Sequence, residues 1–243
     1  MQSLECLKNC YGEIHNDVAT VQRNLAWIYS EKGDIKKAEE LYQNSLRTIV
    51  SIFGENHPET AKISAELAEL CLNLGNLSKA RKLVEKALTT QKSLCGEEHI
   101  DVGHTLNLLG SILLAQNLVV ESKRAHEEAL AIILRSVSEK HEKVGRTKRA
   151  LARVAAACGK YAEALTLAQE ALQNQRNALG ENHVQIAFDH FVLAEVWHKK
   201  GEEDKSRECC EKSLSIFLHH LKLSEDHFEV QKVRHLLSSL HQK

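Results

Sequence analysis

Apolar residues recur at three- and four-residue spacing through most of the chain, which is the pattern of amphipathic helices. In residues 15–56, one such run extends from Val18 to Tyr29, and a second extends from Ile35 to Ile49. Gly33 stands between the two runs, where a glycine favours the end of a helix. The pattern predicts a helical hairpin, with Asp17 as the expected N-cap of its first helix.

The hairpin pattern repeats with a fixed period. Histidines stand 42 residues apart at His15, His57, His99, His141 and His183, and His227 follows after 44. Each lies in or near a Gly-Glu-Asn-His sequence or a variant of it. A period of this length predicts an array of supersecondary units that bury their apolar faces against their neighbours.

Most glycines fall on a second, 21-residue grid that marks both the turn inside each hairpin and the loop between hairpins. They are Gly12, Gly33, Gly54, Gly75, Gly96, Gly159, Gly180 and Gly201. Asn117 and Ser138 occupy the two missing positions. We expect left-handed backbone at these points, which glycine adopts cheaply and asparagine next best.

The two grids divide the chain into consecutive segments. The predicted repeats are 15–56, 57–98, 99–140, 141–182 and 183–226, followed by a C-terminal capping helix at 227–243. Residues 1–14 align with the end of a second helix, so we expect a truncated preceding repeat there. The hypothesis that follows is that the sequence is cut from a longer protein with more repeats upstream.

Composition narrows the functional classes. The formal net charge is −1, so no overall charge favours nucleic acid or a membrane surface. Seven cysteines at mostly apolar helix positions show no disulfide framework, which favours a cytoplasmic location. Residues 102–120 lack charged side chains, but polar residues and the Asn117 turn interrupt them, so we interpret them as a buried helix instead of a membrane span.

The units resemble tetratricopeptide repeats, and more closely the 42-residue repeats of kinesin light chains. The matching motifs are Asn24-Leu25-Ala26-Trp27-Ile28-Tyr29, Lys160-Tyr161-Ala162-Glu163-Ala164 and the Gly-Glu-Asn-His loops. The resemblance covers nearly the whole chain. It implies an all-α, right-handed superhelical solenoid of antiparallel helix pairs that acts as a protein-interaction module.

The resemblance also implies that the first helices line a concave, peptide-binding groove. The register of the Leu-Ala pairs places nine candidate contact residues there. They are Arg23, Trp27, Lys62, Asn107, Arg146, Arg149, Arg153, Phe188 and Phe191.

Three of these arginines, Arg146, Arg149 and Arg153, share one face of one helix because they stand at positions i, i+3 and i+7. Guanidinium groups suit carboxylates, so the face predicts an acidic linear partner, with Phe188 and Phe191 as an aromatic anchor pocket. A solvated basic face with no partner is an equally supported interpretation. Aromatic residues at helical spacing more often pack in the core than contact a partner, so Trp27 is the less favoured of these candidates.

No motif points to catalysis, a metal or a cofactor. The glycines belong to turns, and no phosphate-binding loop or HExxH sequence is present. The recurrent histidines are at least one helix spacing apart, about 9 Å, so they cannot share one ion. We expect them to serve the loops, each hydrogen-bonding the next unit.

The preferred hypothesis is an adaptor that binds a protein or peptide partner, with no nucleic acid and no membrane. A second hypothesis is a regulatory or sensor segment of a larger enzyme or signalling protein that acts through intramolecular contacts. A third is self-association, in which the open half-unit of one copy covers the last helix of another.

Overall fold

The computed structural model describes residues 2–240, and every regular element in that range is a helix. It forms two compact units, residues 1–116 and 117–243. Met1 and residues 241–243, the last part of the expected capping helix, lie outside the described residues. The boundary between the units falls inside the expected third repeat, at the Asn117 turn.

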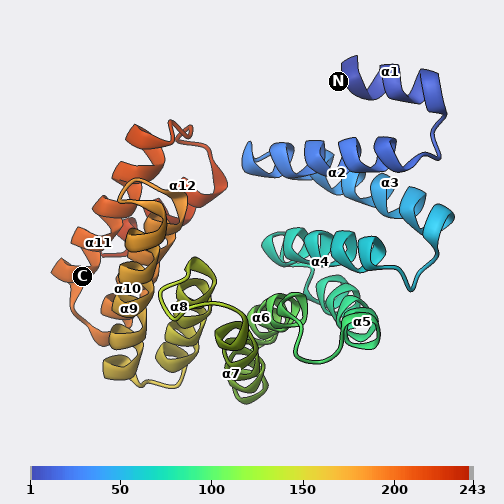
Figure 1. Ribbon diagram of the computed structural model, residues 1–243. Helices are drawn as coiled ribbons and strands as arrows, with labels where there is room; N and C mark the ends of the chain where they lie inside the picture. The colour runs from blue at the N-terminus through green and yellow to red at the C-terminus, as the bar shows by residue number, and fades with distance from the viewer. Residues whose placement is uncertain (1, 241–243) are drawn as a thin grey trace. The chain divides into compact units, whose positions relative to one another are not determined.

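The first unit contains six helices within its described residues. They are α1 Gln2–Tyr11, α2 Asn16–Glu31, α3 Ile35–Phe53, α4 Pro58–Asn73, α5 Leu77–Cys95 and α6 Ile100–Ala115. Helices α2 and α3 pack as one hairpin and α4 and α5 as the next, and each helix also packs on the one that follows it (Figure 1). The apolar core of this unit lies between these helices and includes Val18, Leu41, Ile63, Leu67 and Ile112.

The second unit continues the same arrangement. Its helices are α7 Val119–Ser136, α8 Glu142–Ala157, α9 Tyr161–Leu179, α10 Val184–Lys200, α11 Glu203–Ser215, the π-helix η1 Ile216–His220 and α12 Phe228–Ser239. Helices α8 and α9 form one hairpin, and α10 and α11 form another. The core of this unit includes Ala168, Ile186, Leu193, Phe217 and Val230. Consecutive helical hairpins with no strand in residues 2–240 confirm the all-α array.

The recurrent histidines begin the first helices. In each of six helices, α2, α4, α6, α8, α10 and α12, the N-cap is a histidine whose Nδ1 accepts a hydrogen bond from the backbone N–H two residues on. The donor–acceptor distance at His57 and Glu59 is 3.2 Å. The prediction that Asp17 is the N-cap of α2 is wrong, because Asp17 lies inside the helix and its own backbone N–H donates to His15. The imidazole fills the role that Ser, Thr, Asn or Asp usually has.

The grid glycines all have positive φ, but the two kinds of turn differ. Gly201, after a first helix, is left-handed, whereas Gly54, after a second helix, has φ 82° and ψ 178°. The latter region is accessible almost only to glycine. Asn117 adopts φ 62°, as expected for an asparagine on the grid. Ser138 has no positive φ, and the helix before it ends at an extended Val137 instead.

The last hairpin differs from the others at its end. The π-helix η1 widens the final turn, and Lys222, at the next grid position, has φ 54° without being a glycine. Ser224-Glu225-Asp226-His227 matches the Ser138-Glu139-Lys140-His141 loop, so the two additional residues lie before Ser224, between η1 and this loop. These features account for the 44-residue spacing between the last two histidines.

Neither a membrane span nor a metal-binding cluster is found between residues 2 and 240. No helix there is both long enough and apolar enough to cross a bilayer. No group of three or more His, Cys, Asp or Glu side chains in that range could hold an ion.

Candidate functional site

The nine expected contact residues lie on the first helices of both units. Arg23 and Trp27 are on α2, Lys62 is on α4 and Asn107 is on α6, all in the first unit. In the second unit, α8 carries Arg146, Arg149 and Arg153, which we call the α8 arginine face, and α10 carries Phe188 and Phe191. Each unit therefore presents its own part of the candidate surface.

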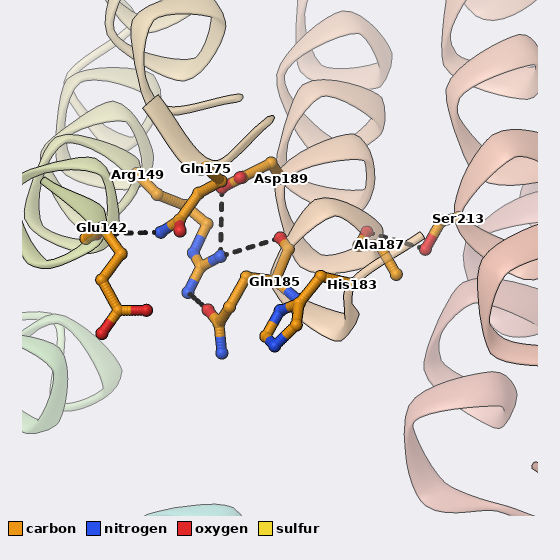
Figure 2. Close-up of polar contacts among 8 residues, drawn as sticks. All are labelled: Glu142, Arg149, Gln175, His183, Gln185, Ala187, Asp189 and Ser213. Carbon is orange, nitrogen blue, oxygen red and sulfur yellow. Dashed lines mark hydrogen bonds and ion pairs between the residues drawn. The ribbon is translucent and has the colours of Figure 1, made fainter. Parts of the chain in front are cut away.

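The middle residue of the α8 arginine face, Arg149, is tied to the neighbouring helix α10. Its Nη1 donates to Asp189 Oδ1 at 3.0 Å and to the Gln185 carbonyl at 3.2 Å, and its Nη2 donates to Gln185 Oε1 at 2.7 Å (Figure 2). The guanidinium carbon also lies 5.6 Å from the centroid of the Phe188 ring. These contacts leave the Arg149 side chain only 15% exposed.

Asp189, the partner of Arg149, is fully buried, with 0% of its side chain exposed. Burial raises the pKa of this carboxyl to about 6, and the charge of Arg149 acts in the opposite direction. Its second oxygen, Oδ2, has no hydrogen-bond partner among residues 2–240. Arg149 is thus the group that makes an ionised carboxylate tolerable at this place.

The two outer residues of the α8 arginine face are accessible. Arg153 is 52% exposed and pairs with Glu195 of α10, with 3.2 Å between Nε and Oε2. Arg146 is exposed and forms no hydrogen bond or ion pair with a described residue. Lys148, in contrast, is mostly covered and pairs with Glu139 and Glu170. The basic side chains of α8 therefore do not form a uniformly solvated face, and its three arginines are not all available to a partner.

Arg23 in the first unit repeats the behaviour of Arg149. Its Nη1 donates to Glu59 Oε2 on α4 at 3.1 Å, and its Nε lies 4.0 Å from Glu66. Arg23 and Arg149 occupy the same repeat position, as do their partners Glu59 and Gln185. The contact joins successive first helices in both units, so these arginines stabilise the stacking of repeats.

The remaining candidate residues differ in exposure. Trp27 is 59% exposed and Lys62 is exposed, whereas Asn107 is half-buried. Phe188 is half-buried and meets the edge of Phe217 at a centroid distance of 5.5 Å, and Phe191 packs partly on the core of its unit. The aromatic pair of α10 is therefore partly engaged in packing.

Sequence reasoning missed the partners of these arginines. Gln185, Asp189 and Glu195 follow the arginines that they bind by 36 to 42 residues. A signal was present, because an arginine and an acid or amide recur at matching positions in Arg23–Glu59 and Arg149–Gln185. Comparing side chains at equal positions in successive repeats would have found this pairing.

Comparison with known proteins gives the same fold. A tetratricopeptide repeat model matches residues 17–93, 59–135 and 143–219. The nearly identical TPR-like repeats of a kinesin light chain from Podosopora anserina superpose with a TM-score of 0.60 at 22% identity, covering 84% of this chain and 97% of that chain. BtubC (BKLC) from P. vanneervenii gives a TM-score of 0.65 at 20% identity, covering 90% of this chain and 87% of the other.

A Rap protein solved in complex with Competence and Sporulation Factor gives a TM-score of 0.70 at 14% identity, covering 96% of this chain and 71% of that one. A search of curated protein sequences finds no match. The structural likenesses establish the fold, and the match to the repeat model extends over most of the chain. The chain therefore belongs to the tetratricopeptide-repeat family of protein-interaction modules.

Proposed function

We propose that the chain binds an acidic linear segment of a partner protein along its first helices, with the α8 arginine face as the main contact. The observation that supports this most is the accessibility of Arg146 and Arg153 on either side of the anchored Arg149. Because Arg149 is paired with Asp189 and bound to Gln185, its charge is already balanced, and the contact rests on the two outer arginines. Arg146 has no such partner and can form forked hydrogen bonds with carboxylates, whereas Arg153 must exchange Glu195 for the partner.

The pair between Arg153 and Glu195 is compatible with this role. It is partly exposed, and exposed ion pairs contribute little to stability, about 0–1 kcal/mol. A carboxylate of the partner can therefore replace Glu195 at little cost. Phe191, half-buried on α10, offers apolar surface beside it for a side chain of the same segment.

A structural neighbour supports a partner-binding role for this kind of array. The similar Rap protein was solved together with Competence and Sporulation Factor. An adaptor role for this chain rests on that fold and on the accessible arginines.

The test uses a fluorescein-labelled peptide in which a tryptophan is flanked by aspartates and glutamates, with fluorescence anisotropy as the readout. The double variant Arg146→Glu/Arg153→Glu should lose at least about tenfold in affinity, since each charge-assisted hydrogen bond contributes about 1.5–3 kcal/mol. Binding should also weaken with added salt. A peptide with asparagine and glutamine in place of the acids should bind poorly.

The matched control is Arg124→Glu, which makes the same charge change at an exposed position of the second helix α7. It should leave the affinity unchanged. Equal affinity for the wild-type protein and the double variant would overturn the proposed function.

A further inference from the structure

A pocket of about 390 Å³ lies in the second unit between α9, α10 and α11, which stand side by side in Figure 1. The α10 residues that line the pocket, His190, Leu193 and Trp197, lie on a different face of the helix from Phe188 and Phe191. The pocket therefore faces away from the α8 arginine face. Leu172, Leu193 and the Trp197 ring supply apolar lining, and Arg176, His190 and Lys212 supply polar groups.

His190 is the most informative of the lining residues. It is only 6% exposed, and its Nδ1 is buried without a hydrogen-bond partner in the described part of the chain. Burial lowers the pKa of His190 to about 4, so the ring is neutral at pH 7. Because Nδ1 is covered by protein, the nitrogen that a ligand in the pocket can reach is Nε2, which is not among the buried atoms and has no hydrogen-bond partner in residues 2–240.

The charges around the pocket favour an anion. Two cations and no carboxylate line it within the described residues. Arg176 Nε lies 2.9 Å from Glu181, and Lys212 Nζ lies 2.6 Å from Glu208, but both glutamates are more than half exposed. Such surface pairs are weak, and a ligand carboxylate can compete for the cations.

The nearest buried carboxylate is already occupied, because Asp189 pairs with Arg149 on the opposite side of α10. Lys205 Nζ lies 4.6 Å from the centroid of the Trp197 ring and 3.2 Å from Glu202 Oε2. Glu181, Glu208 and Glu202 partly balance these cations, and all three carboxylates are at least partly exposed and exchangeable.

We infer that this pocket binds a small amphipathic carboxylate, with its apolar body against Leu172, Leu193 and Trp197 and its head group at His190, Arg176 and Lys212. With its proton on Nε2, the ring nitrogen that is not buried, the neutral imidazole donates to the carboxylate. The volume is that of a site for a small organic ligand, which combines an apolar lining with a few convergent polar groups. The site is separate from the proposed peptide contact, so either can fail without the other.

The chain allows a direct readout. It contains two tryptophans, Trp27 and Trp197. Trp27 is exposed on α2, and Trp27→Phe leaves the indole of Trp197 as the reporter. Octanoate is the probe, and octanol, with the same apolar chain and no charge, is its matched control. We expect a saturable change of Trp197 fluorescence with octanoate and a much weaker one with octanol.

Two variants in the Trp27→Phe background test the polar groups. His190→Leu and Arg176→Gln should each weaken octanoate binding at least about tenfold, because each removes a hydrogen bond to a charged group. Arg124→Gln, at an exposed position of α7 outside the pocket, should not change it. If His190→Leu does not fold, as judged by circular dichroism, Arg176→Gln decides the question.

Equal binding of octanoate and octanol would overturn the inference, and so would an unchanged octanoate affinity in Arg176→Gln. The absence of any saturable signal would do the same.

Discussion

Arg149 and Asp189 form an ion pair with 3.0 Å between Nη1 and Oδ1, and no part of the Asp189 side chain reaches solvent. The central arginine of an expected binding face is thus the counterion of a buried carboxylate on the next repeat. Its first role is to hold α8 against α10. Substitutions at Arg149 therefore test the fold, whereas those at Arg146 and Arg153 test binding.

Arg149→Met should destabilise the second unit by about 3–5 kcal/mol, because it leaves Asp189 buried and unpaired. Urea denaturation followed by circular dichroism measures this free energy of unfolding. Arg149→Met/Asp189→Leu should recover most of the loss, since replacing both members of a buried pair with apolar residues is often neutral. A double variant as unstable as the single one would contradict this account.

His57→Ala should lower the free energy of unfolding of the first unit by about 1 kcal/mol, the usual effect of removing an N-cap. His57 accepts from the Glu59 N–H and also stacks on Phe53 at a centroid distance of 4.3 Å. His57→Asp separates the two effects, because aspartate caps a helix and also suits its positive end. We expect His57→Asp to be close to wild type in thermal unfolding; a loss equal to that of alanine would assign the effect to ring stacking.

The stability of the second unit should fall as the pH drops from about 6.5 to 4. Burial lowers the pKa values of His126 and His190 to about 4, below the unfolded value of about 6.5. In that window the unfolded chain binds more protons than the folded one, so each histidine costs up to about 1.4 kcal/mol per pH unit of acidification. Asp189 acts in the opposite direction: its pKa, raised to about 6, gives stability that is present at low pH and lost as the pH rises.

The variant that isolates the histidine effect is His126→Val, which installs the residue that Val84 provides at the same repeat position. Urea denaturation at several pH values should show a smaller loss between pH 6.5 and 4 than in the wild type. An unchanged pH slope would show that His126 does not contribute.

Gly54→Ala should destabilise the first unit by about 1–3 kcal/mol, the usual cost of such backbone strain. A Cβ at Gly54 would meet no atom within 4 Å, so the cost comes from φ 82° alone and involves no steric contact. Asn117→Gly is the matched comparison in the other kind of turn and should be neutral or slightly stabilising. Thermal unfolding measures both, and an equal response to the two substitutions would refute the distinction between the turns.

Much of the fold follows from the sequence because the periodic positions act locally. Most helices here end at a residue with positive φ, as at Gly33, Gly54 and Asn117, and glycine or asparagine at these periodic positions predicts the ends. The caps were less predictable. Asp17 is of a residue type that usually caps helices, but the N-cap is His15, whose ring accepts from the Asp17 N–H.

The candidate site was predictable only as a set of positions. Spacing places Arg149 on the first-helix face, but its availability depends on Asp189, which comes from the next repeat and is fully buried. The pocket at His190 was not predictable, because its lining comes from three helices and depends on how their side chains leave space. Such a pairing or pocket depends on the distances between side chains of different repeats, and the repeat period of the sequence does not determine these distances.

The boundary between the two compact units lies at Gln116 and Asn117, half a repeat away from the histidine joints. The segment that recurs in the sequence is therefore not the segment that packs as a block. Amide hydrogen exchange reports such blocks, because residues that open together share one protection level. The step between protection levels should fall in the α6–α7 loop and not at His99 or His141. An excised fragment ending at Gln116 should therefore retain more order than one ending at Glu98, which lacks α6.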